Sequence, residues 1–158
     1  MAEDNAAAAA AKWVEDHKNR YLESDGQDGH LLDYTTSGTG HPYTPTLLLK
    51  TIGRKSGREI ITPLIYGRWK GDFVIVGSKG GAPEHPAWYL NIQANPHVTI
   101  QAACEKFTAQ AHDAPESERP RIWDYMQVLF PGYTEYQKGT DRTIPVVLLT
   151  PTAKVEKL

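Results

Sequence analysis

The chain has 158 residues, of which 40% are hydrophobic and 23% charged, and its formal net charge is −2. This composition is typical of one soluble globular domain, and the slight acidity argues against a nucleic-acid binder, which would usually be basic. The only cysteine, Cys104, excludes an intramolecular disulfide and fits a reducing compartment, and no run of about 18 apolar residues predicts a membrane span.

The first predicted element is a helix over residues 6–22, where Val14, Lys18 and Tyr21 recur at helical spacing. Its apolar face is narrow, so three placements are open: packing on the body of the protein, lying on a membrane surface, or fraying. No basic leader precedes the alanine run at 6–11, so we do not expect a secretory signal. Residues 24–45 are rich in Gly, Asp, Thr and Pro and predict a long loop.

Six segments rich in Leu, Ile and Val lie between short turns and predict strands. They are residues 46–52, 59–66, 72–77, 98–103, 106–112 and 144–150. Connections this short favour antiparallel pairing. Helices are expected at 83–94 and 115–129, the second with Asp113 as N-cap and with Pro120 kinking it or delaying its start. The aromatic segment 130–137 is expected to be an exposed loop.

These elements predict a mainly β, α+β fold: a split antiparallel β-barrel of about six strands with flanking helices. We divide the chain into an N-terminal helix and loop, residues 1–44, and a barrel domain, residues 45–158.

Positive charge is concentrated at one turn of the predicted sheet. The turn GRKSGR, residues 53–58, carries three cations, and Lys79 follows a later strand of the same meander. Cations at neighbouring strand ends can converge on one anionic ligand. A turn whose cations are simply solvated is the alternative. Neither a P-loop nor a GxGxxG dinucleotide motif is present.

Two tyrosines in the aromatic segment, Tyr133 and Tyr136, suit a lid over a flat ligand, and a local aromatic cluster is the alternative. The six histidines are scattered without metal-ligand spacing, and no nucleophile has an assembled base, so we expect neither a metal site nor covalent catalysis. Chemistry is then expected to come from a bound cofactor.

Three segments, residues 46–67, 74–101 and 130–151, resemble in order and spacing the deazaflavin-dependent nitroreductase family. Members of that family have a split β-barrel. The resemblance implies binding of coenzyme F-420, a 5-deazaflavin with a phospholactate and oligoglutamate tail. It implies hydride transfer from the reduced form to a quinone, a nitroaromatic or nitroimidazole, or an activated enone.

The resemblance also implies roles for matching positions. Arg54, Lys55 and Ser56 would hold the anionic tail, and a strand would run along the cofactor with Ile60, Ile61, Thr62, Pro63, Leu64 and Ile65. The deazaflavin and its phosphate would lie against Val76, Gly77, Ser78, Lys79, Ala87, Trp88, Tyr89, Leu90 and Asn91. Tyr133 would contact both cofactor and substrate, with Ser78 and Tyr136 as further catalytic candidates.

Two rival functions stay open: an oxidoreductase of the same barrel that uses FMN, and a non-catalytic deazaflavin-binding protein. The expected partner is a small-molecule electron acceptor and not a nucleic acid. Peripheral membrane contact through the N-terminal helix and a homodimer are also open. The expected location is the cytoplasm or the inner face of the cell membrane.

Overall fold

The structure is a computed structural model that describes residues 2–35 and 40–158, with side chains from residue 5 onward. Residues 36–39 of the predicted 24–45 loop lie outside the described residues. In chain order the elements are α1 (Ala2–Glu23), β1 (Leu31–Leu32), β2 (Thr44–Ile52), β3 (Glu59–Ile65), β4 (Gly67–Trp69), β5 (Asp72–Val76), a 3-10 helix (Lys79–Gly81), α2 (Ala87–Ala94), β6 (His97–Ala102), β7 (Glu105–Asp113), α3 (Arg119–Leu129), α4 (Gly132–Lys138) and β8 (Val146–Val155).

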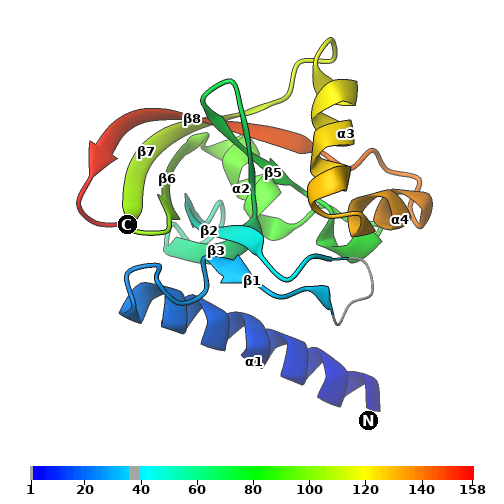
Figure 1. The fold of residues 1–158 in the computed structure, drawn as a ribbon, viewed down its shortest axis with the longest axis horizontal. Coiled ribbons are helices and arrows are strands. Elements are labelled where there is room, and N and C mark those ends of the chain that lie inside the picture. The colour runs from blue at the N-terminus through cyan, green and yellow to red at the C-terminus, as the bar shows by residue number, and fades with distance from the viewer. Residues whose placement is uncertain (1, 36–39) are drawn as a thin grey trace.

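The strands form one curled antiparallel sheet (Figure 1), in the order β1-β2-β6-β7-β8-β5-β4, and β3 pairs with β2 along residues 46–52. Only Tyr66 separates β3 from β4, so these two strands are halves of one bent strand that joins both ends of the sheet. The bend passes close to α3, because a Cβ at Gly67 would lie 2.7 Å from the sulfur of Met126. The predicted split barrel is therefore confirmed, and its six predicted strands correspond to β2, β3, β5, β6, β7 and β8.

The apolar side chains divide between two cores because neighbouring residues of a strand face opposite ways. On β5, Phe73 and Ile75 enter the barrel interior with residues of β2, β6 and β8. The intervening Val74 and Val76 face outward and pack under α3 and α4. The sheet thus has one face around the barrel interior and another covered by the two helices.

Helix α3 begins at Arg119, later than the predicted residue 115, which agrees with the expectation that Pro120 would delay its start. Asp113 is the last residue of β7, so its predicted role as N-cap is wrong, and Glu118 occupies that position. The carbonyl of Pro115 accepts the amides of Glu118 and Arg119, which makes residues 115–118 a turn before the helix. Pro120 then stands in the first turn of α3, where its missing N–H costs nothing.

The predicted exposed loop at 130–137 is wrong, because α4 occupies most of it. Pro131 is the N-cap of α4, and its fixed φ starts the helix that follows. Phe130 and Tyr133 are each only 4% exposed and pack into the outer core. The aromatic residues therefore belong to a buried wall of the protein.

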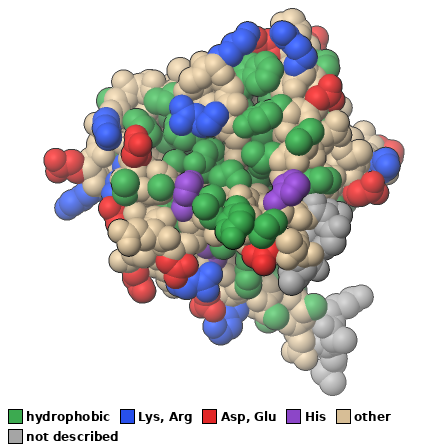
Figure 2. Space-filling model, in the orientation of Figure 1, with side chains coloured by type: hydrophobic (Ala, Val, Ile, Leu, Met, Phe, Trp, Pro, Cys, Tyr) green, Lys and Arg blue, Asp and Glu red, His purple; other side chains and the backbone are tan. Residues whose placement is uncertain are grey.

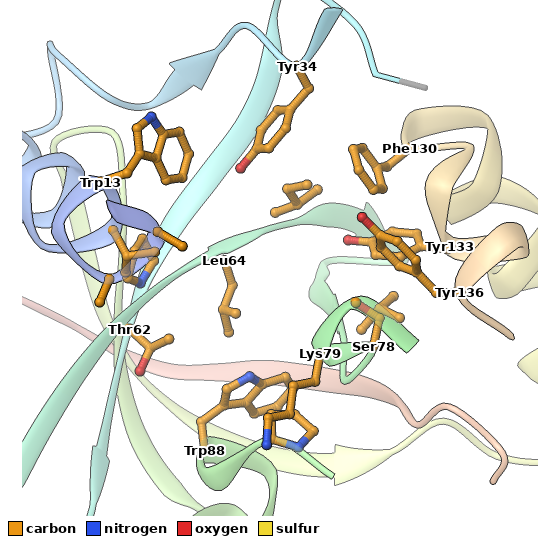
Figure 3. Close-up of a pocket in the computed structure, with 18 residues that line it drawn as sticks. Trp13, Tyr34, Thr62, Leu64, Ser78, Lys79, Trp88, Phe130, Tyr133 and Tyr136 are labelled. Carbon is orange, nitrogen blue, oxygen red and sulfur yellow. The ribbon is translucent and has the colours of Figure 1, made fainter. Parts of the chain in front are cut away.

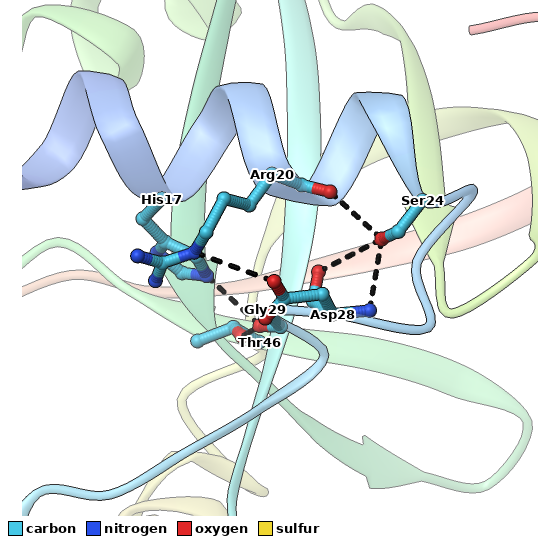
Figure 4. Close-up of polar contacts among 6 residues, drawn as sticks. All are labelled: His17, Arg20, Ser24, Asp28, Gly29 and Thr46. Atoms are coloured by element: carbon cyan, nitrogen blue, oxygen red, sulfur yellow. Dashed lines mark hydrogen bonds and ion pairs between the residues drawn. The ribbon is translucent and has the colours of Figure 1, made fainter.

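Helix α1 lies along one side of the barrel and is held mainly by its C-terminal half (Figures 1 and 4). His17 is buried, and its Nε2 lies 2.8 Å from the carbonyl of Gly29. Tyr21 is fully buried and donates its hydroxyl to the carbonyl of Thr46 at 2.9 Å. Residues 5–16, by contrast, are exposed. The structure thus places the helix on the body of the protein.

Hydrophobic side chains gather in the middle of the face seen in Figure 2, with charged side chains mostly toward its edges. Across residues 2–35 and 40–158, every helix is too short or too polar to cross a membrane.

Candidate functional site

A cavity of about 980 Å³ lies between β3, the exposed half of α1, and the segment that contains α4 (Figure 3). Its lining residues come from six parts of the chain. They are Ala10, Ala11, Trp13, Val14, Tyr34, Thr62, Pro63, Leu64, Ile65, Val76, Ser78, Lys79, Gly80, Pro86, Trp88, Phe130, Tyr133 and Tyr136. This volume lies at the upper end of the range for small-molecule sites.

Strand β3 shows that this space is a gap in the packing of an apolar surface. It pairs with β2 along its whole length, and Leu47, Leu48 and Leu49 of β2 are fully buried. The residues of β3 are nearly as apolar, yet 61–65 are only half-buried and Ile60 is 40% exposed. An apolar strand left uncovered beside a cavity is typical of a surface that a ligand covers.

One end of the cavity is polar and carries a cation. Ser78, Lys79 and Gly80 belong to the Lys79 loop, which we define as residues 77–82. Lys79 has φ 45° and Gly80 φ 62°, both in the left-handed region. A non-glycine residue in this region is uncommon and is often found in turns and at functional sites. The Lys79 Nζ lies 2.7 Å from Glu84, and this hydrogen bond lowers the pKa of the Glu84 carboxyl.

The other end is aromatic. The Trp13 and Tyr34 rings meet edge-on with centroids 6.3 Å apart, and Tyr34 meets Phe130 at 5.4 Å. Phe130 in turn contacts Tyr133 and Tyr136 of α4, at 5.0 and 6.2 Å. A continuous aromatic wall thus runs from α1 to α4 above the polar end of the cavity (Figure 3).

Two tyrosine hydroxyls of this wall are neutral near pH 7, and burial disfavours their ionised form further. It raises the pKa of Tyr34 to about 12 and raises the pKa of Tyr133 above its usual value of 10. A neutral tyrosine both donates and accepts hydrogen bonds, so these groups are suited to a carbonyl-bearing ligand.

The cationic turn lies beyond the end of β3, outside the cavity. The backbone N–H and Nη1 of Arg54 both donate to Oδ1 of Asn91, at 3.1 and 3.0 Å. Asn91 is 2% exposed, and its Nδ2 donates to Thr51. Glu59, where β3 begins after the turn, is three residues from Thr62, or about 10 Å along the strand.

The structure brings half of the sequence-predicted site residues to the cavity wall. These are Thr62, Pro63, Leu64, Ile65, Val76, Ser78, Lys79, Trp88, Tyr133 and Tyr136. The other predicted residues do not line it: Arg54, Lys55, Ser56, Ile60, Ile61, Gly77, Ala87, Tyr89, Leu90 and Asn91. Tyr89 turns elsewhere and donates its hydroxyl to Asp113 at 3.0 Å.

The sequence did not predict the contribution of α1, Tyr34, Gly80, Pro86 and Phe130 to the wall. Alanines such as Ala10 and Ala11 carry no chemical signal, and Trp13 lies on a helix whose docking the sequence left open. Among the described residues, no group of three or more His, Cys, Asp or Glu side chains could hold a metal ion.

Residues 13–151 match the family model described as F420H(2)-dependent quinone reductase. The chain belongs to this family. F420H(2) is the reduced form of coenzyme F-420, so the predicted F-420-dependent split-barrel family is confirmed.

Individual relatives agree with this placement. The chain is 37% identical to an F420H(2)-dependent quinone reductase of Mycobacterium tuberculosis, over 85% of this chain and 87% of that protein. A solved structure described as an F-420-dependent reductase is 39% identical, with a TM-score of 0.62 over 66% of this chain and 93% of its own. Another, described as a domain-swapped dimer, is 36% identical, with a TM-score of 0.65 over 89% of this chain and 98% of its own.

Proposed function

We propose that the protein reduces quinones with reduced coenzyme F-420 bound in the cavity between α1, β3 and α4. The observation that carries this proposal is the half-buried apolar strand β3, which lies beside a cation at one end and below an aromatic wall at the other. A flat ring system with an anionic side chain needs this combination of surfaces. When bound, reduced F-420 would supply the hydride.

In this proposal the flat ring lies against β3 and Trp88. The cavity wall there consists of Thr62, Pro63, Leu64 and Trp88. Lys79 faces the phosphate, which competes with the carboxylate of Glu84 for its ammonium group. The tail extends along β3 past Glu59, about 10 Å from Thr62 along the strand, toward the turn with Arg54, Lys55 and Ser56. Asn91 acts on the tail indirectly, because its amide fixes the backbone and guanidinium of Arg54.

The aromatic wall receives the acceptor. Trp13, Tyr34 and Phe130 offer apolar ring surfaces to a flat quinone, and Tyr136 lies beside them. The neutral hydroxyl of Tyr133 would hydrogen-bond a quinone oxygen as negative charge develops there. The first half of α1 covers this end and limits the entry of water. Nitroaromatic, nitroimidazole and enone acceptors share the flat, electron-poor form and are proposed as further substrates.

Three related predictions stand beside this function. FMN, with one terminal phosphate, is the less favoured cofactor because it leaves the turn at 53–58 without a partner. A homodimer is proposed because a similar solved structure is described as a domain-swapped dimer. Contact of α1 with a membrane surface stays a prediction.

Substitution of Lys79 tests the proposed cofactor site directly. A charge-assisted hydrogen bond contributes about 1.5–3 kcal/mol, so Lys79→Ala is expected to weaken F-420 binding about tenfold or more. Glu84→Gln is expected to strengthen it, because the ammonium group no longer has a competing carboxylate. The measurement is a fluorescence titration with F-420. Lys138→Ala is the control, because Lys138 also pairs with a glutamate but does not line the cavity. Equal affinities for all four proteins would contradict the proposed site.

A further inference from the structure

Arg142 lies between α4 and β8 and is not among the residues that the sequence predicted for the site. Its guanidinium makes four hydrogen bonds to one short stretch of chain. Nε donates to the carbonyl of Ala82 at 2.8 Å, and Nη2 donates to the carbonyl of Ser78 at 2.7 Å. Nη1 donates to the carbonyl of Gly77 and to Nδ1 of His85, each at 3.1 Å. One side chain thus ties residues 77–85 together.

The three carbonyls all belong to the Lys79 loop, in which one residue has an unfavourable backbone conformation. Lys79 has φ 45°, in the left-handed region that non-glycine residues rarely adopt, whereas Gly80 and Gly81 adopt φ of 62° and 83° without a steric penalty. The loop has few bonds of its own: the amide of Gly81 donates to Ser78 and that of Ala82 to Lys79. Strained conformations persist where the surroundings fix them, and the bonds from Arg142 hold carbonyls on both sides of Lys79.

Both the segment around Arg142 and the Lys79 loop are also fixed to α4, which supplies Tyr133 and Tyr136 to the aromatic wall. Gln137 of α4 donates its Nε2 to the carbonyl of Arg142 at 2.8 Å and accepts the amide of Ile144 at 2.9 Å. The loop meets α4 directly as well, because a Cβ at Gly81 would lie 2.8 Å from the carbonyl oxygen of Tyr136. Figure 1 shows α4 beside the green part of the chain near residue 80, which contains the Lys79 loop.

We propose that Arg142 is a positioning residue that sets the cationic wall of the cavity against its aromatic wall. It holds Ser78 and Lys79 through their loop and is itself held by Gln137 of α4. A guanidinium suits this role because its planar, forked donors reach several carbonyls at once, which a lysine ammonium cannot reproduce. The effect on the cofactor rests on the proposed function, whereas the effect on the loop does not.

The first test uses the free protein and hydrogen exchange read by mass spectrometry. In Arg142→Lys and Arg142→Ala, amides of residues 77–82 are expected to exchange about tenfold faster or more, while those of β6 and β7 are unchanged. Arg119→Ala is the matched control, since Arg119 donates to the carbonyl of Ile144 at 2.7 Å without touching the loop. Unchanged exchange at 77–82 in both Arg142 variants, or equal acceleration across the sheet, would overturn the proposal.

The second test asks whether Arg142 acts through Lys79. F-420 affinity is titrated for Arg142→Lys, Lys79→Ala and the double variant. If Arg142 only positions Lys79, the double variant is expected to bind no more weakly than Lys79→Ala alone, because coupled residues are not additive. Independent, multiplying losses would overturn the positioning role. If the wild-type protein itself bound no F-420, the proposed function would fail. Hydrogen exchange would still show whether Arg142 holds the Lys79 loop in place.

Discussion

Replacing Tyr21 by Phe tests whether α1 is anchored over the cavity as the structure shows. The hydroxyl of Tyr21 shares its one hydrogen between the carbonyls of Thr46 at 2.9 Å and Gln101 at 3.2 Å, and accepts the amide of Ala103 at 2.8 Å. Its side chain is fully buried, so phenylalanine fills the same space and removes only these bonds. One donated and one accepted hydrogen bond are lost, each contributing about 1 kcal/mol, so Tyr21→Phe should lower the free energy of unfolding by about 2 kcal/mol.

Urea unfolding measures this change, and thermal unfolding should show a melting temperature lower by roughly 4–8 °C for a chain of this length. Tyr43→Phe is the matched control, because Tyr43 is 74% exposed and should tolerate the loss of its hydroxyl. Since α1 supplies Trp13 to the aromatic wall, Tyr21→Phe should also weaken the binding of a quinone. A loss of stability equal to that of Tyr43→Phe would refute the anchoring.

Three further predictions follow from the same contacts. Trp13→Ala should raise the KM for a quinone several-fold with little change in F-420 affinity. The control is Leu22→Ala, because Leu22 is an exposed residue of α1 that does not line the cavity. Equal effects of the two substitutions on KM would remove Trp13 from the acceptor site. Gly81→Ala should lower stability by about 1–2 kcal/mol in urea unfolding, because φ is +83° and the new Cβ would meet the carbonyl of Tyr136; wild-type stability would contradict that contact. Burial lowers the pKa of His17 below 6.5, so the unfolded chain binds more protons below that pH and stability should fall on acidification. His17→Gln should reduce this dependence in urea titrations, and stability that rises toward acid would contradict it.

The barrel was predictable because its signal is local. Strands β2 and β5 are runs of Leu, Ile, Val and Phe between turns, and the turns are too short for any pairing except an antiparallel one. The closure of the barrel depends on a bend at Tyr66 and Gly67, which carries no sequence signal beyond one glycine. The start of α3 was misplaced because Asp113 fits an N-cap equally well as the last residue of a strand.

The site was predicted where its residues carry chemistry and missed where tertiary packing creates it. Lys79 and Ser78 stand in a glycine-rich stretch that attracts notice in the sequence. Pro131 and Gly132 resemble a turn, so α4 was read as a loop, although Pro131 begins a helix. Arg142 is one arginine in an irregular segment, and only the fold shows that its guanidinium reaches a loop 60 residues earlier in the chain.

The most direct test of the proposed activity is anaerobic turnover with a water-soluble naphthoquinone, with reduced F-420 or reduced FMN as donor at equal concentration. Oxidation of the donor is followed by its absorbance, with Lys79→Ala run beside the wild-type protein. The proposed function predicts rapid, quinone-dependent oxidation of reduced F-420, slow oxidation of reduced FMN, and a clear loss of the F-420 rate in Lys79→Ala at limiting cofactor. Faster turnover with FMN, or no quinone-dependent oxidation of reduced F-420, would contradict it.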